Sequence, residues 1–68
     1  MKYVVVYEPT QTGWSAYVPD LPGCVAAGDT REETERLMRE AIGLHIQALR
    51  EDDEAVPEPG AFTATVEV

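Results

Sequence analysis

The sequence has one cysteine, Cys24, and one histidine, His45, among its 68 residues. One thiol cannot close a disulfide within the chain, and one thiol plus one histidine is too few for a structural zinc site. A domain of this length buries only roughly 60% of the surface that its unfolded chain exposes. We therefore expect one domain over residues 1–68 that gains extra stability from a second copy or a partner protein.

Composition excludes several classes of protein. Apolar residues make up 44% of the chain, which is too many for a disordered segment. No stretch approaches the roughly 20 apolar residues of a membrane span, so we expect no membrane association. The apolar start is also too short for a signal-peptide core, because Glu8 interrupts it. We expect a cytoplasmic protein in which Cys24 stays reduced.

The net charge of −8 comes from thirteen acidic residues against five basic ones. Binding to phosphates requires a basic face, and acidic residues surround the few basic ones here. We therefore expect no direct binding to nucleic acid. An acidic surface suits solubility, or steering toward a basic partner.

Hydrophobic patterning predicts four strands. Residues 2–8 are rich in valine and tyrosine and apolar on both faces, which is typical of a central strand. After a turn from Pro9 to Gly13, residues 14–18 form the returning strand of a hairpin. Residues 24–27 form a short third strand. Residues 62–68 alternate between apolar and polar side chains, which predicts a half-buried edge strand.

A helix is predicted from Thr30 to about Arg50. Thr30 and Glu33 fit a capping box, in which the threonine side chain caps the helix and the glutamate reaches back. The apolar residues cover nearly half of the circumference, more than the ~100° stripe that a small sheet requires. This wide arc indicates that a second surface touches the helix, with Ile46 at its margin. The arc comprises Leu37, Met38, Ala41, Ile42, Leu44, His45, Ile46, Ala48 and Leu49.

These elements predict an α+β fold of the order β-β-β-α-β. We expect a four-stranded mixed sheet, with strand order 3-2-1-4 and the helix on one face. One helix covers only one face, so the apolar residues on the other face predict a homo-oligomer. The sheet face opposite the helix, or the strand edge beside it, is the expected interface, with Tyr3, Tyr7 and Tyr17 as anchors. The full set of candidate residues for an oligomer or partner interface is Tyr3, Tyr7, Trp14, Tyr17, Asp20 and Ile46.

The sequence predicts no catalytic, metal-binding or cofactor-binding residues. Cys24 and His45 are the only candidates for a nucleophile and its base, and they fall on different elements, with His45 inside the apolar arc of the helix. The glycines punctuate separate turns and form no phosphate-binding loop. Aromatic residues cluster on the hairpin, but without basic residues around them they favour a protein interface over RNA stacking.

One combination of motifs resembles a known family. The run Pro19-Asp20-Leu21-Pro22-Gly23-Cys24, with Gly28, Thr30 and Glu33 after it, resembles the signature of the HicB-like antitoxins. The resemblance covers essentially the whole chain, since three further pieces also match. These are Gly13-Trp14 with Tyr17, Ala41-Ile42, and Pro57-Glu58-Pro59.

The resemblance implies a partial RNase H-like fold that lacks the RNase H carboxylates. It also implies an antitoxin that docks on a small basic HicA-type ribonuclease, which cleaves messenger RNA, and masks its active site. Many family members continue into a DNA-binding domain, whereas this sequence stops at Val68, so we expect a short stand-alone form without operator binding. Two alternatives stay open. One is a homo-oligomeric domain with no toxin partner, and the other is a degenerate RNase H-like enzyme.

Overall fold

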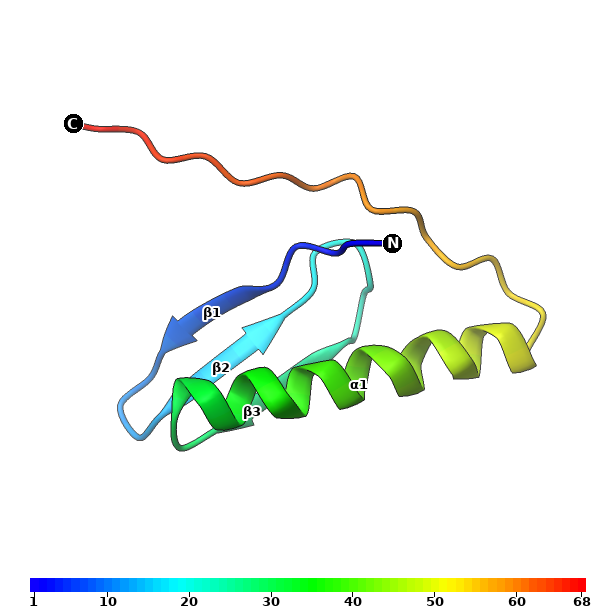
Figure 1. Cartoon of the computed structure of the whole chain (residues 1–68), viewed down its shortest axis with the longest axis horizontal. Helices are drawn as coiled ribbons and strands as arrows, with labels where there is room; N and C mark the ends of the chain where they lie inside the picture. Colours follow the sequence, from blue (N-terminus) through cyan, green and yellow to red (C-terminus); the bar gives the residue numbers. More distant parts are fainter.

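The computed structural model describes all 68 residues (Figure 1). Three strands, β1 (Val6–Pro9), β2 (Trp14–Tyr17) and β3 (Val25–Gly28), precede one long helix, α1 (Arg31–Glu51). The strands form an antiparallel sheet in the order β1-β2-β3. Residues 54–68 follow the helix as an extended chain that crosses back over the N-terminus. The fold is therefore a two-layer α+β domain with an extended C-terminal segment.

The sheet register determines which residues meet the helix. Tyr7 pairs with Ala16, and Ala16 pairs with Ala26, so these three side chains lie in a row on one face. All three belong to or pack against the hydrophobic core. The helix α1 packs against β2 and β3 from that side. We call this side the covered face of the sheet, and the side without a helix the open face.

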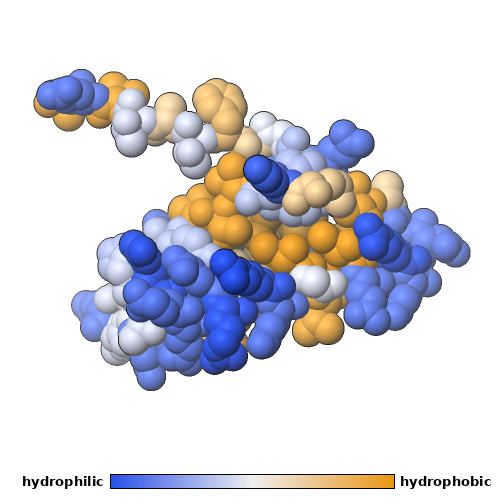
Figure 2. All heavy atoms as spheres, viewed as in Figure 1, coloured by the Kyte–Doolittle hydropathy of each residue, from blue (hydrophilic) through white to orange (hydrophobic).

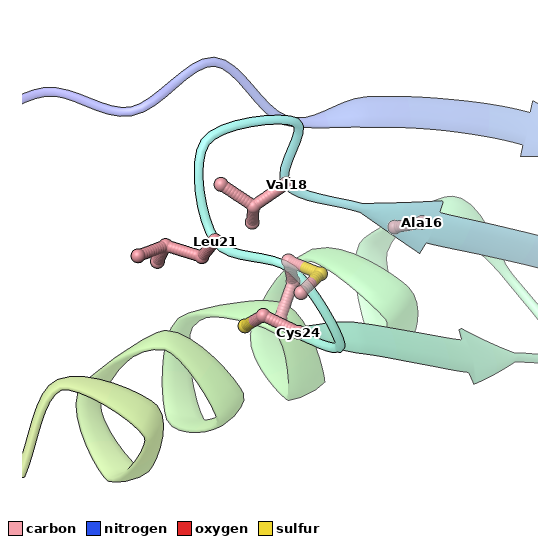
Figure 3. Packing of buried hydrophobic residues seen from close by; sticks show 5 residues of the cluster. Ala16, Val18, Leu21 and Cys24 are labelled. Carbon is pink, nitrogen blue, oxygen red and sulfur yellow. The ribbon is translucent and has the colours of Figure 1, made fainter. Parts of the chain in front are cut away.

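The core is small and comes largely from the loop between β2 and β3. Three of its five side chains belong to residues 18–24, and they gather where this loop passes beside α1 (Figure 3). Only six residues of the chain are buried, including one threonine, so half-buried apolar side chains surround the core. The five core residues are Ala16, Val18, Leu21, Cys24 and Met38.

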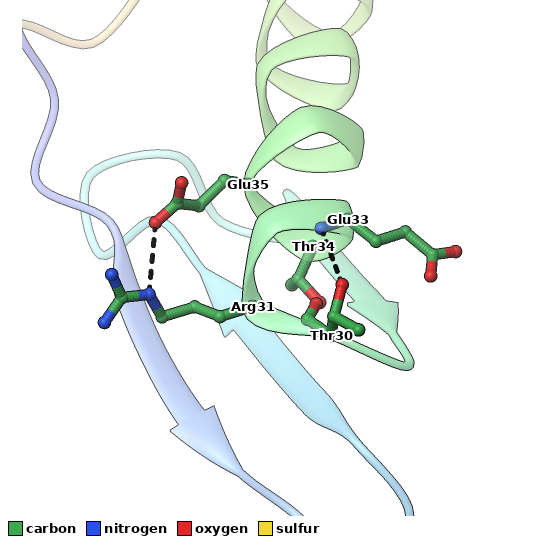
Figure 4. Close-up of polar contacts among 5 residues, drawn as sticks. All are labelled: Thr30, Arg31, Glu33, Thr34 and Glu35. Carbon is green, nitrogen blue, oxygen red and sulfur yellow. Dashed lines mark hydrogen bonds and ion pairs between the residues drawn. The ribbon is translucent and has the colours of Figure 1, made fainter.

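The start of α1 is held by the predicted cap. The Thr30 side chain accepts a hydrogen bond from the Glu33 N–H over 3.1 Å (Figure 4). The Glu33 carboxylate accepts in turn from the N–H of Asp29, one residue before the cap. Thr34 is fully buried, and its hydroxyl donates to the Thr30 carbonyl over 2.8 Å. The prediction of a helix from Thr30 to about Arg50 is thus confirmed.

The fourth predicted strand does not form in the single chain. Residues 62–68 are extended, and their backbone groups make no hydrogen bond within the chain. Consequently β2 is the central strand, and β1 lies at an edge, contrary to the prediction that the first strand is central. The predicted order of the first three strands is confirmed.

The first strand is also shorter at its start than predicted. Ladder pairing begins at Val6, opposite Tyr17, and not at Lys2. Two residues after Tyr17 comes Pro19, which turns the chain out of the sheet. Residues 2–5 therefore continue past the end of β2 with no strand opposite them.

We predict that Thr30→Ala lowers the free energy of unfolding by roughly 1 kcal/mol, because the Glu33 N–H loses its acceptor. Urea denaturation followed by circular dichroism measures the change. Thr12→Ala is the matched control, since the Thr12 hydroxyl makes no hydrogen bond and the residue is exposed. Equal stability of both variants would contradict the capping role.

Candidate partner-binding surface

The open face of the sheet carries an apolar row across all three strands. Val6 pairs with Tyr17, and Tyr17 pairs with Val25, so the three side chains stand next to each other. Tyr17 is 42% exposed and Val25 is 63% exposed, while Val6 is half-buried. Alternation places the exposed carboxylate of Glu8 on the same side of β1 as Val6. This row, Val6-Tyr17-Val25, is a hydrophobic surface on the side of the sheet that no helix covers.

Tyr3 and Tyr7 lie on the other side of the sheet. Both pack against the core on the covered face, so they do not lie on the open face, which was one of the two places predicted for them. The alternation of β1 explains this, because residues 3, 5 and 7 share the face that the helix takes. Burial raises the pKa of the Tyr7 hydroxyl, and the charge of Glu35 adds to the increase, while nearby arginines oppose it. Of the three predicted tyrosine anchors, only Tyr17 belongs to the open face.

Trp14 and Ile46 also contact the chain itself. Trp14 is half-buried opposite Gly28, on the same side of β2 as Ala16. Ile46 is half-buried and packs against the core. It also forms the apolar wall of an open hollow of about 490 Å³ on the C-terminal half of α1. The other residues that line the hollow are Gly43, Gln47, Arg50 and Glu51.

Asp20 binds the C-terminal segment of its own chain. One carboxylate oxygen accepts hydrogen bonds from the backbone N–H groups of Gly60 and Ala61, at 3.1 and 3.0 Å. The Tyr3 hydroxyl donates a further hydrogen bond to the carbonyl of Pro57. These contacts attach residues 57–61 to the β2–β3 loop and to the start of the first strand. The carboxylate of Asp20, predicted as a partner contact, is thus engaged within the chain.

The other motif residues shape the loop and the helix start. Leu21 and Cys24 fill the core, and Gly23 adopts φ +83°, a conformation that residues with a side chain rarely take. Gly28 lets β3 approach the helix closely, because an added Cβ would stand 2.8 Å from the Thr34 hydroxyl. Pro19 and Pro22 are exposed in the turns of the loop. These motif residues therefore shape the loop and the start of the helix.

The structure also places the two residues considered for catalysis. Cys24 is buried, and burial raises the pKa of its thiol, which favours the unreactive protonated form. His45 is half-buried on α1, within the apolar arc that the sequence predicted. No group of three or more histidine, cysteine, aspartate or glutamate side chains has the geometry to hold a metal ion.

Acidic residues outnumber basic ones by thirteen to five. Two of the five basic residues, Arg31 and Arg36, form ion pairs with glutamates one turn further along α1, at 3.4 and 3.5 Å. Both pairs are largely exposed, so they add little to stability. The pairs leave the net charge of −8 unchanged, since each joins one positive and one negative side chain. Figure 2 shows apolar side chains in the middle of one view of the molecule, with hydrophilic groups on either side.

The sequence prediction missed two exposed apolar residues. Val25 was predicted to lie in a short strand, but the sequence did not show which side of the sheet it takes. The pairing register that aligns Val25 with Tyr17 is set by the loop between β2 and β3. Leu44 was assigned to the apolar arc of the helix but is 67% exposed. The spacing of apolar residues along the helix could not reveal the exposure of Leu44, since α1 extends beyond the small sheet on which it packs.

Comparison with known proteins identifies the family. The family model described as HicB_like antitoxin of bacterial toxin-antitoxin system matches residues 3–67. The chain belongs to this family. The resemblance seen in the loop motif is therefore confirmed, and the match includes the extended C-terminal segment.

Several relatives share substantial identity with the chain. An uncharacterised 14.9 kDa protein of Haemophilus phage HP1 is 44% identical over 57 residues, which cover 84% of this chain and 43% of that protein. Antitoxin HicB 2 of Photorhabdus laumondii is 36% identical over 59 residues, covering 87% and 42%. The chain thus spans less than half the length of these two relatives. A UPF0150 protein of Thermoplasma acidophilum is 36% identical over 67 residues, covering 97% of both chains.

A solved structure shares the fold. A chain in the HicA3 and HicB3 toxin-antitoxin complex aligns with a TM-score of 0.75 and 32% identity, covering 88% of this chain and 70% of that one. The α+β architecture is thus that of a protein found in such a complex. Separately, no helix combines the length and apolar composition that crossing a membrane requires.

We predict that Asp20→Ala lowers the free energy of unfolding by about 1–2 kcal/mol, because two backbone N–H groups lose a charged acceptor. Amide hydrogen exchange at Gly60 and Ala61 should accelerate in the same variant. Glu58→Ala removes the same charge from an exposed residue of the same segment and should change neither quantity. Unchanged exchange at both amides in Asp20→Ala would show that the segment is held by other contacts.

We predict that the Cys24 thiol reacts with a thiol reagent only when the chain unfolds, because it is buried and its pKa is raised. The unfolded chain loses this proton at a lower pH than the folded chain does. The contribution of Cys24 to stability is therefore fully present below the ordinary thiol pKa and is lost as the pH rises above it. Reaction rates with and without urea test the prediction. A native rate close to that in urea would contradict it.

Proposed function

We propose that the chain acts as an antitoxin that binds a HicA-type ribonuclease toxin and neutralises it by covering the toxin's active site. The observation that carries the proposal is the family match over residues 3–67. The structural likeness to a chain of a HicA–HicB complex supports a toxin of that type as the partner. Neutralisation in this proposal is a matter of binding and occlusion.

The proposed docking surface is the open face of the sheet. The Val6-Tyr17-Val25 row offers a hydrophobic centre, with a tyrosine of the kind that is favoured in interface cores. Glu8 lies on the same side of β1 as Val6, and the net charge of the chain is −8. A basic toxin would be attracted by this charge and would bury the apolar row. The covered face is unsuitable because α1 already packs there.

The proposed role requires no chemistry from this chain. Cys24 is buried as a thiol, and the motif residues hold the loop and the helix start. The acidic surface also disfavours direct contact with nucleic acid, since phosphates would be repelled. We therefore propose a non-enzymatic protein whose partner is another protein and which binds no nucleic acid directly.

A matched pair of substitutions tests the docking surface. Val25→Asp places a charge at the β3 end of the apolar row, next to Tyr17, and Leu44→Asp places the same charge on α1. The two positions are similarly exposed, at 63% and 67%. We predict that Val25→Asp weakens binding to the HicA-type toxin at least about tenfold, as expected for an unpaired charge in an interface core. Leu44→Asp should bind like the unaltered protein.

Isothermal titration with a purified toxin inactivated at its catalytic residue measures both affinities, and circular dichroism verifies that both variants fold. Inhibition of mRNA cleavage by the active toxin should follow the same order. If Leu44→Asp weakens binding and Val25→Asp does not, the toxin binds the helix and the open-face assignment is wrong. Absence of binding by the unaltered protein would favour an oligomeric domain with no toxin partner.

A further inference from the structure

The C-terminal residues 62–68 have the properties of a β-strand but lack a neighbour. Their apolar residues alternate with Thr63, Thr65 and Glu67, and the chain is extended. Phe62 is 86% exposed and Val66 is 83% exposed. No backbone hydrogen bond involves any residue after Ala61. An alternating segment of this kind gains stability only when a sheet edge pairs with its backbone.

The base of this segment is fixed in space. The carboxylate of Asp20 binds the N–H groups of Gly60 and Ala61, and the Tyr3 hydroxyl binds the carbonyl of Pro57. Beyond these contacts, the chain runs away from the three strands of its own sheet (Figure 1). The family match reaches residue 67, so the segment is part of the domain. The segment is therefore held at its base by its own chain, while residues 62–68 make no hydrogen bond.

The same molecule offers a suitable edge. The strand β1 pairs with β2 alone, so its outer edge has unpaired backbone groups. Residues 3–5 lengthen that edge beyond the ladder, giving a run from Tyr3 to Pro9 that equals residues 62–68 in length. The opposite edge of the sheet, β3, has only four residues. Unpaired strand edges readily accept a strand from another chain.

We propose that two copies of this chain exchange their C-terminal segments, with residues 62–68 of each copy pairing along the β1 edge of the other. Each three-stranded sheet then gains a fourth strand, and β1 becomes an inner strand. A two-fold axis relates the two contacts, so in one dimer both β1 edges and both C-terminal segments find a pairing partner. Strand addition occurs at the edge, and it leaves the open face uncovered. The proposal is therefore independent of toxin binding.

The first measurement establishes whether two copies associate and through which residues. Sedimentation equilibrium at micromolar concentration should give twice the 7.5 kDa mass of one chain. Mixing isotope-labelled and unlabelled protein then allows contacts between copies to be detected separately by filtered NOE spectroscopy. Phe62 is the only phenylalanine, so its ring signals are unambiguous. We expect inter-copy NOEs between residues 62–68 and residues 3–9.

Two proline variants test the pairing itself. In an edge strand, the N–H groups of adjacent residues point alternately toward and away from the neighbour. Ala64 and Thr65 are adjacent, so only one of their N–H groups can donate to the neighbouring strand, and the other faces solvent. Of the variants Ala64→Pro and Thr65→Pro, the one at the donating position therefore removes a hydrogen bond of the sheet, whereas the other removes none. We expect one variant to weaken the dimer about tenfold or more and the other to weaken it much less. Ala55→Pro is the control, because Ala55 is exposed and its N–H makes no hydrogen bond.

Three results would overturn the proposal. A mass of 7.5 kDa up to the highest soluble concentration excludes a stable dimer. NOEs from residues 62–68 that occur only within one copy would mean that the segment folds onto its own β1. Dimer formation that neither proline variant alters would mean that another surface joins the copies. Toxin inhibition is measured separately, so a monomer that still inhibits would refute strand exchange alone.

Discussion

The packing of the β2–β3 loop against α1 is the interaction on which the rest of the structure depends. Val18, Leu21 and Cys24 come from this short stretch and make up most of the buried core, with Met38 of the helix against them. The loop can take this shape because Gly23 accepts a positive φ, which an L side chain would strain. The core of this small domain is thus built by a loop and a helix, with the sheet contributing mainly Ala16.

The same loop decides which surfaces stay free. By seating α1 against β2 and β3, it assigns one face of the sheet to the helix and leaves the Val6-Tyr17-Val25 row uncovered. Through Asp20, it also anchors the C-terminal segment at Gly60 and Ala61. The open face and the free β1 edge are therefore two consequences of one packing arrangement. The two surfaces bind in different ways: a sheet face makes side-chain contacts, whereas a strand edge makes backbone hydrogen bonds.

The sequence predicted the local elements well because their signals are local. The helix start is specified by Thr30 and Glu33, and the first three strands are bounded by proline and glycine, so their order followed directly. Failures occurred where a long-range relationship decides the outcome. The open face was one of two places predicted for Tyr3 and Tyr7, and it does not hold them, since alternation shows which residues share a face and not which face the helix takes. The alternation of residues 62–68 likewise predicts a strand without saying whose edge it joins.

Because the hydrophobic core is small, association with a second copy or a partner would add to the stability of the domain. Only six residues are buried, and the half-buried side chains around them lose water only when another surface arrives. A partner that binds the folded chain and not the unfolded one stabilises the fold in proportion to the logarithm of its concentration. A strand added at the β1 edge would rigidify the sheet that carries the open face, without occupying that face. Under the two proposals, self-association and toxin binding would each stabilise the folded chain, through surfaces that do not overlap.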